Sequence, residues 1–532
     1  MKKLILAGIS FIFVQFLSGQ TWSAGQMFGG TGNNQAFFLE RLSDDELVMG
    51  GLYEKALDNV PDWPLARGNR DIFLATYGAD RQISSIVGIG GAFREQLWAL
   101  DTDGKRGLVV AGQYTVEASI DTFLFRSDPF PTATFVARLN GNLELEWWVQ
   151  LVGTGIVEVS DLEIGALGEI YVTGTFQDSM WWNDELIVAK GASDMFVARM
   201  DPLGNLDWIR HFGQSGDTRT TAMDERDGVL LLAGVFNDQT SFGGAGMTAN
   251  TKDLDVFLLT MDAQTAAVSW AVKAGGVFDE EVSKVLIDEA GACYAFGQLI
   301  GVMNISPDQS IQSSTGQSDL FVLKYSPSGV PLMAKAFNAP GPQLAADMEL
   351  SGTQLIVTGY YQNELSLPPF ELGRSDNYNG FVASLGQNDL TPTWLLEAVG
   401  SDGVYPSDLL IGRDEIWLLG NFSGQVDAGE IQLRGISQSD IFLMDIQTST
   451  AVSAIAPLSL DLFPNPAAHA LNIRTPYPAA HITLYSNQGV QVLQQSIQYQ
   501  AVITTTGLMP GQYWLLLRYE DRLTVAPVII AR

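Results

Sequence analysis

Three aspartates occupy one position in three similar segments of the chain. Asp161, Asp347 and Asp408 lie 13, 12 and 12 residues before the glycine that ends the following strand-like run. If these side chains face a shared cavity, they could bind a cation or a sugar hydroxyl, or form the carboxylate pair that cleaves a glycosidic bond. The simpler interpretation is that they are solvated or locally bonded acids in an acid-rich chain. Both interpretations depend on the elements that carry the three residues.

Tryptophans are a second source of binding chemistry. Trp181 and Trp182 follow a predicted strand, in what the sequence indicates is an exposed loop, where their rings could stack on sugars. Burial between neighbouring sheets is the alternative, because large aromatic side chains commonly form cores.

Histidine and cysteine chemistry has little support. The chain has one cysteine, Cys293, and three histidines, and His211 has no serine or cysteine partner in a recognisable pattern. We expect Cys293 to be a buried apolar residue. The sequence Asp101-Thr-Asp-Gly104 lacks the further oxygen ligands of a calcium hand, so it is predicted to be a hairpin turn.

A polar residue recurs two positions before a phenylalanine that opens an apolar run. Because the position is polar in six of the seven segments, Ala133 being the exception, it is unsuited to catalysis, which needs a unique constellation. We expect these side chains to cap the turn before a strand by hydrogen bonding to the backbone, with calcium binding in the loops as the alternative. The residues are Asp71, Ala133, Asp194, Asp255, Asp319, Asn379 and Asp440.

Two independent markers show that the middle of the chain is repetitive. A strand-like run ending in glycine recurs in steps of 60 to 63 residues, and a phenylalanine recurs in steps of 60 to 64. Seven repeats of this length point to one supersecondary unit per repeat. The glycines are Gly50, Gly112, Gly174, Gly234, Gly297, Gly359 and Gly420, and the phenylalanines are Phe73, Phe135, Phe196, Phe257, Phe321, Phe381 and Phe442.

Each repeat contains about four runs of alternating apolar and polar residues joined by turn sequences, which predicts four antiparallel strands. Seven such units predict an all-β fold with a seven-bladed β-propeller. The seventh repeat lacks its tryptophan strand, and a matching strand, Trp22 to Gly29, stands ahead of the first repeat. We expect it to complete the seventh blade. These repeats resemble the bacterial β-propeller repeat (SBBP) proteins, a resemblance that implies a fold and no particular activity.

Composition excludes several classes of protein. The chain carries 29 Lys plus Arg against 60 Asp plus Glu, a net charge of -31, which disfavours binding to nucleic acid or to an anionic membrane. Apolar residues make up 46%, enough for a folded core. No cofactor is implied, and calcium is the one ion that the acidic loops could use.

The first residues have the layout of a secretory signal. Two lysines precede a 14-residue, mostly apolar run from Leu4 to Leu17, and small or polar residues follow. We assign residues 1–20 to a signal peptide and 21–457 to the propeller. No later segment has 18 uninterrupted apolar residues, so we expect no transmembrane segment in the mature chain.

Residues 458–532 differ in composition from the rest, with four arginines and three acids, and alternate like a small β-sandwich. Their Pro464-Asn465-Pro466 opening, the turn ending at Gly489 and the Pro-Gly-Gln-Tyr run that contains Gly511 and Tyr513 resemble the type A C-terminal sorting domain of the bacterial type IX secretion system. The resemblance implies recognition by that machinery, passage through the periplasm, and release from or attachment to the outer surface.

Together these observations predict an exported propeller protein that acts as a non-catalytic binding or structural module, with an extracellular glycan or protein as ligand. Two alternatives remain open. One is a secreted carbohydrate-active enzyme, a glycoside hydrolase or lyase with carboxylates at the channel. The other is an adhesin whose loops are stiffened by calcium.

Overall fold

The computed structural model describes residues 20–250, 252–314, 316–447, 460–477, 480–486, 491–519 and 522–531. It divides into two units, Met1–Thr448 and Ser449–Arg532. The predicted signal peptide, apart from Gln20, and the predicted boundary at 457 lie outside the described residues, as does Gly489. The described part is all-β, and none of its segments is a helix long and apolar enough to cross a membrane.

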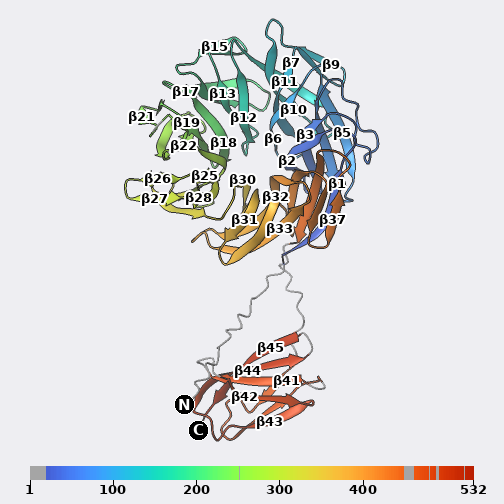
Figure 1. Ribbon diagram of the computed structural model, residues 1–532, viewed down its shortest axis with the longest axis vertical. Helices are drawn as coiled ribbons and strands as arrows, with labels where there is room; N and C mark the ends of the chain where they lie inside the picture. Colours follow the sequence, from blue (N-terminus) through green and yellow to red (C-terminus); the bar gives the residue numbers. More distant parts are fainter. Residues whose placement is uncertain are drawn as a thin grey trace. The chain divides into compact units, whose positions relative to one another are not determined.

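The larger unit is built from antiparallel sheets that follow one another around a ring (Figure 1). In the described residues, seven sheets share a core of four consecutive strands. The first strands are β2 (Asn34–Ser43), β6 (Gln96–Thr102), β12 (Val157–Ile164), β18 (Thr218–Arg226), β24 (Glu280–Ile287), β30 (Gln343–Ser351) and β34 (Val404–Ile411). The second strands are β3 (Glu46–Tyr53), β7 (Leu108–Thr115), β13 (Ile170–Phe176), β19 (Val229–Phe236), β25 (Cys293–Leu299), β31 (Gln354–Leu367) and β35 (Glu415–Phe422).

The outer half of each sheet is formed by its third and fourth strands. The third strands are β4 (Asp71–Gly78), β10 (Thr132–Leu139), β16 (Asp194–Met200), β22 (Asp255–Asp262), β28 (Asp319–Tyr325), β32 (Phe370–Gly386) and β38 (Asp440–Gln447). The fourth strands are β5 (Ile83–Gly90), β11 (Leu145–Gly153), β17 (Leu206–Phe212), β23 (Val268–Ala274), β29 (Pro331–Phe337), β33 (Pro392–Gly400) and β1 (Thr21–Phe28).

The ring is closed by the N-terminal strand. β1 pairs antiparallel with β38, so that Met27 lies opposite Phe442, and it supplies the fourth strand of the last sheet. This confirms the predicted closure. Because the first and last parts of the unit share one hydrogen-bonded sheet, β38 has no unpaired edge on that side.

The recurring glycine and the recurring phenylalanine lie opposite each other on the second and third strands. Gly174 lies opposite Phe196 and Gly420 opposite Phe442. A Cβ added at Gly174 would lie 2.1 Å from the backbone oxygen of Glu158 and 2.7 Å from the Phe196 ring. The glycine is therefore required because the ring covers its Cα. In the first repeat the partner of Phe73 is Gly51, one residue after the predicted glycine.

Short hairpins reach back from one repeat to the outer edge of the preceding sheet. β8–β9, β14–β15 and β36–β37 pair with β5, β11 and β33. Covering an edge strand in this way limits pairing with other chains. The hairpins are β8 (Glu117–Ile120) with β9 (Phe123–Arg126), β14 (Ser179–Trp182) with β15 (Glu185–Val188), β20 (Gln239–Phe242) with β21 (Ala245–Thr248), β26 (Val302–Ser306) with β27 (Gln309–Gln312), and β36 (Gln425–Ala428) with β37 (Ile431–Arg434).

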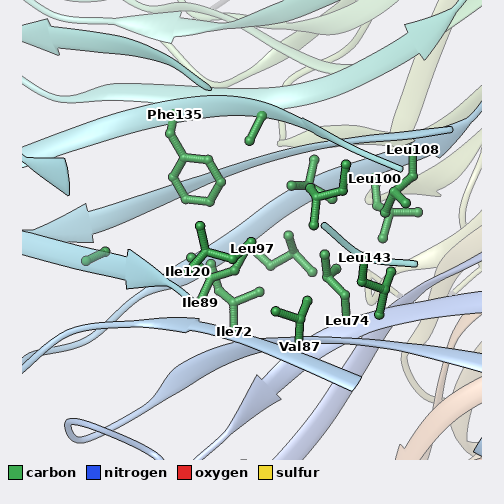
Figure 2. Packing of buried hydrophobic residues seen from close by; sticks show 14 of the residues in the cluster. Ile72, Leu74, Val87, Ile89, Leu97, Leu100, Leu108, Ile120, Phe135 and Leu143 are labelled. Atoms are coloured by element: carbon green, nitrogen blue, oxygen red, sulfur yellow. The ribbon is translucent and has the colours of Figure 1, made fainter. Parts of the chain in front are cut away.

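The core lies between neighbouring sheets. Figure 2 shows Ile72 and Leu74 of the first sheet packed against Leu97 and Phe135 of the second. All four are at most 5% exposed. Burying such side chains contributes about 1.5–3 kcal/mol each, so the contact between sheets, repeated around the ring, stabilises the unit.

The smaller unit contains two sheets that share one core. β39 (Asp461–Phe463), β40 (Ala470–Arg474) and β43 (Gln500–Thr504) form one sheet, and β42 (Gln491–Ile497), β41 (Ala480–Ser486), β44 (Gly511–Tyr519) and β45 (Arg522–Ile530) form the other. Leu471 and Ile503 from the first sheet and Leu484 and Leu515 from the second belong to the same buried cluster.

Candidate functional site

The first strands of all seven sheets line a central channel. They surround a cavity of about 320 Å³. Asp161, Asp347 and Asp408 all line this cavity, an arrangement that the sequence analysis stated only as a condition, and their role in ligand binding stays a prediction. The charged residues of the wall are Glu40, Asp101, Asp161, Glu163, Asp224, Asp347, Glu349, Asp408 and Lys284.

Each predicted channel aspartate is bonded to the next sheet. The backbone N–H of Met223 donates to Asp161 Oδ2 at 2.8 Å, and that of Leu409 donates to Asp347 Oδ2 at 2.9 Å. Asp408 Oδ2 accepts from the N–H of Leu39 at 2.6 Å, across the junction between the last and first repeats. The three carboxylates therefore connect adjacent sheets.

Two further aspartates also accept a backbone N–H from the next sheet. When the first strands are compared by their pairing with the second strands, these aspartates lie two residues beyond the position of Asp161. Asp101 Oδ2 accepts from the N–H of Ile164 at 2.6 Å, and Asp224 Oδ2 accepts from the N–H of Ile287 at 2.5 Å. The prediction that Asp101 belongs to a hairpin turn is wrong, because it lies on β6 and only the residues after Thr102 turn. Spacing did not reveal them, because Asp101 lies 11 residues before Gly112 and Asp224 lies 10 before Gly234, offsets that differ from those of the three predicted aspartates.

Among the described residues that line the channel, Lys284 is the one with a cationic side chain. It lies 13 residues before Gly297, which makes it the counterpart of Asp161, and the sequence analysis missed it. Its Nζ is 3.6 Å from Asp347 Oδ1 and 3.9 Å from Glu349 Oε1. These carboxylates and Asp161 outweigh the opposing effect of burial and hold the Lys284 pKa well above its ordinary value.

Burial also controls the protonation of the channel acids. It raises the pKa of seven of the carboxyl groups, and neighbouring carboxylates add to the effect at most of them, whereas Lys284 and backbone N–H groups act in the opposite direction. The channel therefore holds fewer negative charges at neutral pH than its composition implies. The seven residues are Glu40, Asp101, Asp161, Glu163, Asp224, Glu349 and Asp408.

Asp347 and Asp408 share one backbone donor. Both accept from the Leu409 N–H at 2.9 Å, and burial together with the nearby Asp347 carboxylate raises the Asp408 pKa well above its ordinary value. Among the residues that the structure describes, no group of three or more Asp, Glu, His or Cys side chains is arranged to hold a metal ion. Calcium binding stays an untested prediction.

The recurring polar residue before each third strand caps its loop, as predicted. Asp71 accepts from the N–H groups of Arg67 and Gly68 at 2.9 and 3.3 Å, and Asp194 accepts from Lys190 and Gly191 at 3.0 Å each. Equivalent bonds to N–H groups of the preceding loop are made by Asp255, Asp319 and Asp440. The exceptions are Ala133, which has no polar side chain, and Asn379, which lies inside β32 and accepts from the N–H of Gly400 at the end of β33.

The predicted tryptophan site differs from the structure. Trp181 and Trp182 lie on strand β14 at the edge of the second sheet, not in a loop. Trp182 is 0% exposed and contacts Phe196 edge to face, so it cannot stack on a sugar ring. Alternation along the strand leaves only Trp181 partly exposed, beside Phe130.

Cys293 and His211 are both held in structural positions. Cys293 is 1% exposed, and burial raises its pKa to about 12, which disfavours the thiolate. The Nδ1 atom of His211 lies 2.9 Å from the loop-capping Asp194.

In the smaller unit, two of the predicted sorting residues hold the chain together. Asn465 Oδ1 accepts from the N–H of Ile529 at 2.7 Å, which ties the Pro464-Asn465-Pro466 segment to the last strand. Tyr513 is 7% exposed and donates its hydroxyl to the Met509 oxygen at 3.0 Å. Gly511 begins strand β44.

Comparison with known proteins gives weak likenesses for most of the chain. The uncharacterized WD repeat-containing protein L264 of Acanthamoeba polyphaga mimivirus is 20% identical over 435 residues, with 64% of this chain and 31% of that protein covered. The chain thus spans about a third of the length of this curated relative.

Solved structures are similar at a comparable level. Quinohemoprotein alcohol dehydrogenase from Comamonas testosteroni matches with a TM-score of 0.37 and 9% identity, over 82% of this chain and 79% of that one. PorZ, a surface component of the type-IX secretion system of Porphyromonas gingivalis, matches with a TM-score of 0.24 and 11% identity, over 93% and 81%. These scores carry no argument about activity.

The smaller unit gives a specific result. Residues 461–531 match the secretion system C-terminal sorting domain. This confirms the resemblance that the Pro-Asn-Pro and Pro-Gly-Gln-Tyr motifs carry, and it implies secretion to the cell surface or the extracellular space. Residues 461–531 therefore belong to the family of type IX secretion C-terminal sorting domains.

Proposed function

We propose that the chain is an exported seven-bladed β-propeller of the bacterial repeat type, carried to the cell exterior by a C-terminal β-sandwich sorting domain, and that it is a non-catalytic binding or structural module. In this proposal residues 1–20 are a cleaved signal, 21–457 the propeller and 458–532 the sandwich. Seven sheets with a common four-stranded core and the sorting-domain match at 461–531 support this organisation.

The observation that carries the non-catalytic part is the use of the channel aspartates. Asp161, Asp347 and Asp408 each accept a backbone N–H from the next sheet. A glycosidase acid pair must turn its oxygens toward substrate and water. Carboxylates that join sheets are occupied by structural bonds, and Asp101 and Asp224 repeat the pattern where catalysis would need a unique site.

The test is incubation of the purified mature chain with algal, plant and microbial polysaccharides, measuring new reducing ends and retention on the polymer in the same tubes. We expect no new ends. Release that Asp347→Asn or Asp408→Asn abolishes, and that the matched channel variant Asp224→Asn leaves intact, would overturn the proposal in favour of a hydrolase.

The hydrolase alternative is favoured by one observation, the pairing of Asp347 and Asp408 on one backbone N–H, because a glycosidase needs two neighbouring carboxyl groups in acid and base roles. Export is tested separately. Deleting 458–532 should keep the propeller from reaching the cell exterior, and unchanged export would contradict the sorting role.

A further inference from the structure

A second hollow is lined by residues near the starts of the first strands, in the sheets that contain β12, β18, β24 and β30. Its volume is about 500 Å³, within the range of small-molecule sites. Ser160 and Thr221 line both this hollow and the channel, so the two cavities adjoin.

The hollow exists because side chains that fill the equivalent space elsewhere are missing. On one side of the hollow the residue after the marker glycine is Gln298, whose Oε1 accepts from the Ala345 N–H of the next sheet at 3.0 Å, and in the last repeat Asn421 bonds to both the N–H and the oxygen of Ala36. Thr175 and Val235 occupy this position at the hollow and are shorter.

Buried polar atoms in its wall lack hydrogen-bond partners. Glu280 is 1% exposed, and neither carboxyl oxygen has a partner of normal geometry. The Oγ1 atoms of Thr175 and Thr221 are also buried without partners. Leaving such groups unpaired is costly, and each of them can accept a hydrogen bond from a bound donor.

The charge of the wall indicates that the bound donor should be positively charged. Glu158, Asp279 and Glu281 are exposed carboxylates beside Glu280, and Arg219 is the one cationic residue in the wall. The adjoining channel adds eight carboxyl groups against one lysine. Walls of one sign focus the field and attract ligands of the other sign.

The remaining wall is aliphatic. Val235, Leu254, Ile300 and Leu344 line the hollow, and no aromatic ring does. Sugar recognition by ring stacking therefore has no platform here, whereas a chain of methylene groups can pack against this surface.

We propose that this hollow binds a primary ammonium group on an alkyl chain, with Glu280 and the threonine hydroxyls accepting its N–H bonds and the aliphatic residues covering its methylene groups. The proposal deepens the binding function proposed above and rests on it. A free polyamine and a lysine side chain share this chemistry.

The test measures binding to the purified mature chain by calorimetry at pH 7.5, with spermidine, an N-acetylated and C-amidated trilysine peptide, and maltotriose as probes. Burial and the neighbouring Asp255 raise the pKa of Glu280 to about 9, so at pH 7.5 the free site holds a neutral acid that an incoming ammonium group must deprotonate. Glu280→Gln keeps the shape of the site but cannot form that carboxylate. Thr175→Gln places at this junction the longer amide side chain with which Gln298 reaches the next sheet. Glu95→Gln is the matched control, because Glu95 holds the equivalent strand position, is equally buried and unpaired, and is not in the wall of the hollow.

We expect spermidine or the trilysine peptide to bind, at least tenfold more weakly to Glu280→Gln and Thr175→Gln, and within twofold of the wild type to Glu95→Gln. The probe that binds more tightly identifies the source of the ammonium group. No binding of either cation, or equal loss in Glu95→Gln, would overturn the inference. Maltotriose binding alone would also overturn it while leaving the proposed binding module intact, and polysaccharide cleavage would instead overturn the proposed function.

Discussion

Replacing Glu95 with glutamine should stabilise the larger unit at neutral pH. The Glu95 side chain is 0% exposed, and its two oxygens have no hydrogen-bond partner of normal geometry. Burial, with the nearby Asp71 carboxylate, raises its pKa to about 8, although the Gly91 N–H and Arg67 act in the opposite direction. The acid is therefore neutral in the folded protein at pH 7 and ionised in the unfolded chain.

The magnitude follows from proton linkage. Between pH 4.5, the ordinary value, and pH 8, the folded state holds a proton that the unfolded state has lost, so stability falls by about 1.4 kcal/mol per pH unit. By pH 7 the loss is about 3 kcal/mol. Glutamine does not titrate, so the Glu95→Gln variant does not have this loss. For a unit of this length, average unfolding entropies convert the difference into about 3 °C of melting temperature.

Calorimetric melting of wild type and Glu95→Gln at pH 5, 6, 7 and 8 checks the reasoning. The advantage of the variant should be small at pH 5 and grow steadily to pH 8. Glu185→Gln, a change at an exposed position, should show no such trend. An advantage for Glu95→Gln that stays constant with pH, or a wild type that gains stability as pH rises, would refute the burial argument.

Other consequences follow from the channel, the ring and the core. Lys284→Met should lower the melting temperature by more at pH 8 than at pH 5.5, because more of the channel acids are ionised and uncompensated at the higher pH; an equal loss at both would contradict the charge role. Gly174→Ala should cost at least about 2 kcal/mol of unfolding free energy, while Gly246→Ala, where a Cβ meets nothing within 4 Å, should cost under about 1 kcal/mol, as chemical denaturation would measure. Removing Thr21–Phe28 should destabilise the unit and promote association through the exposed β38 edge, detectable by light scattering; a monomer as stable as wild type would argue against closure by β1. Cys293 should react with a thiol reagent in the native protein orders of magnitude more slowly than after unfolding.

Much of the architecture could be read from the chain because a repeat makes one local rule visible seven times. The glycine and phenylalanine spacings predicted the second and third strands. The structure shows why the two residues recur with the same period, because they pair across the strands and the phenylalanine ring lies over the Cα of the glycine, as at Gly174 and Phe196. The missing last strand was likewise a local signal, since the Trp22 segment matched the strand that the seventh repeat lacked.

The side-chain environments were harder to predict. Trp181 and Trp182 are adjacent in sequence, yet strand alternation buries one and leaves the other partly open, and neither fact can be known until the hairpin's position on the preceding sheet is fixed. Asp101 was assigned to a turn because the sequence beyond it turns, whereas its carboxylate meets the N–H of a residue 63 positions away.

The sequence by itself therefore determined the repeat, its strand content, the acidity of the chain and the sorting motif, because each depends on residues close together in the chain. Only the tertiary structure decided which carboxylates meet. Ring closure brings residues from seven repeats to one axis, where a shared backbone N–H joins Asp347 to Asp408 and where Lys284 lies among acids from other sheets. The hollow that contains Glu280 likewise depends on side chains from four sheets, and their distances are set by packing rather than by spacing along the chain.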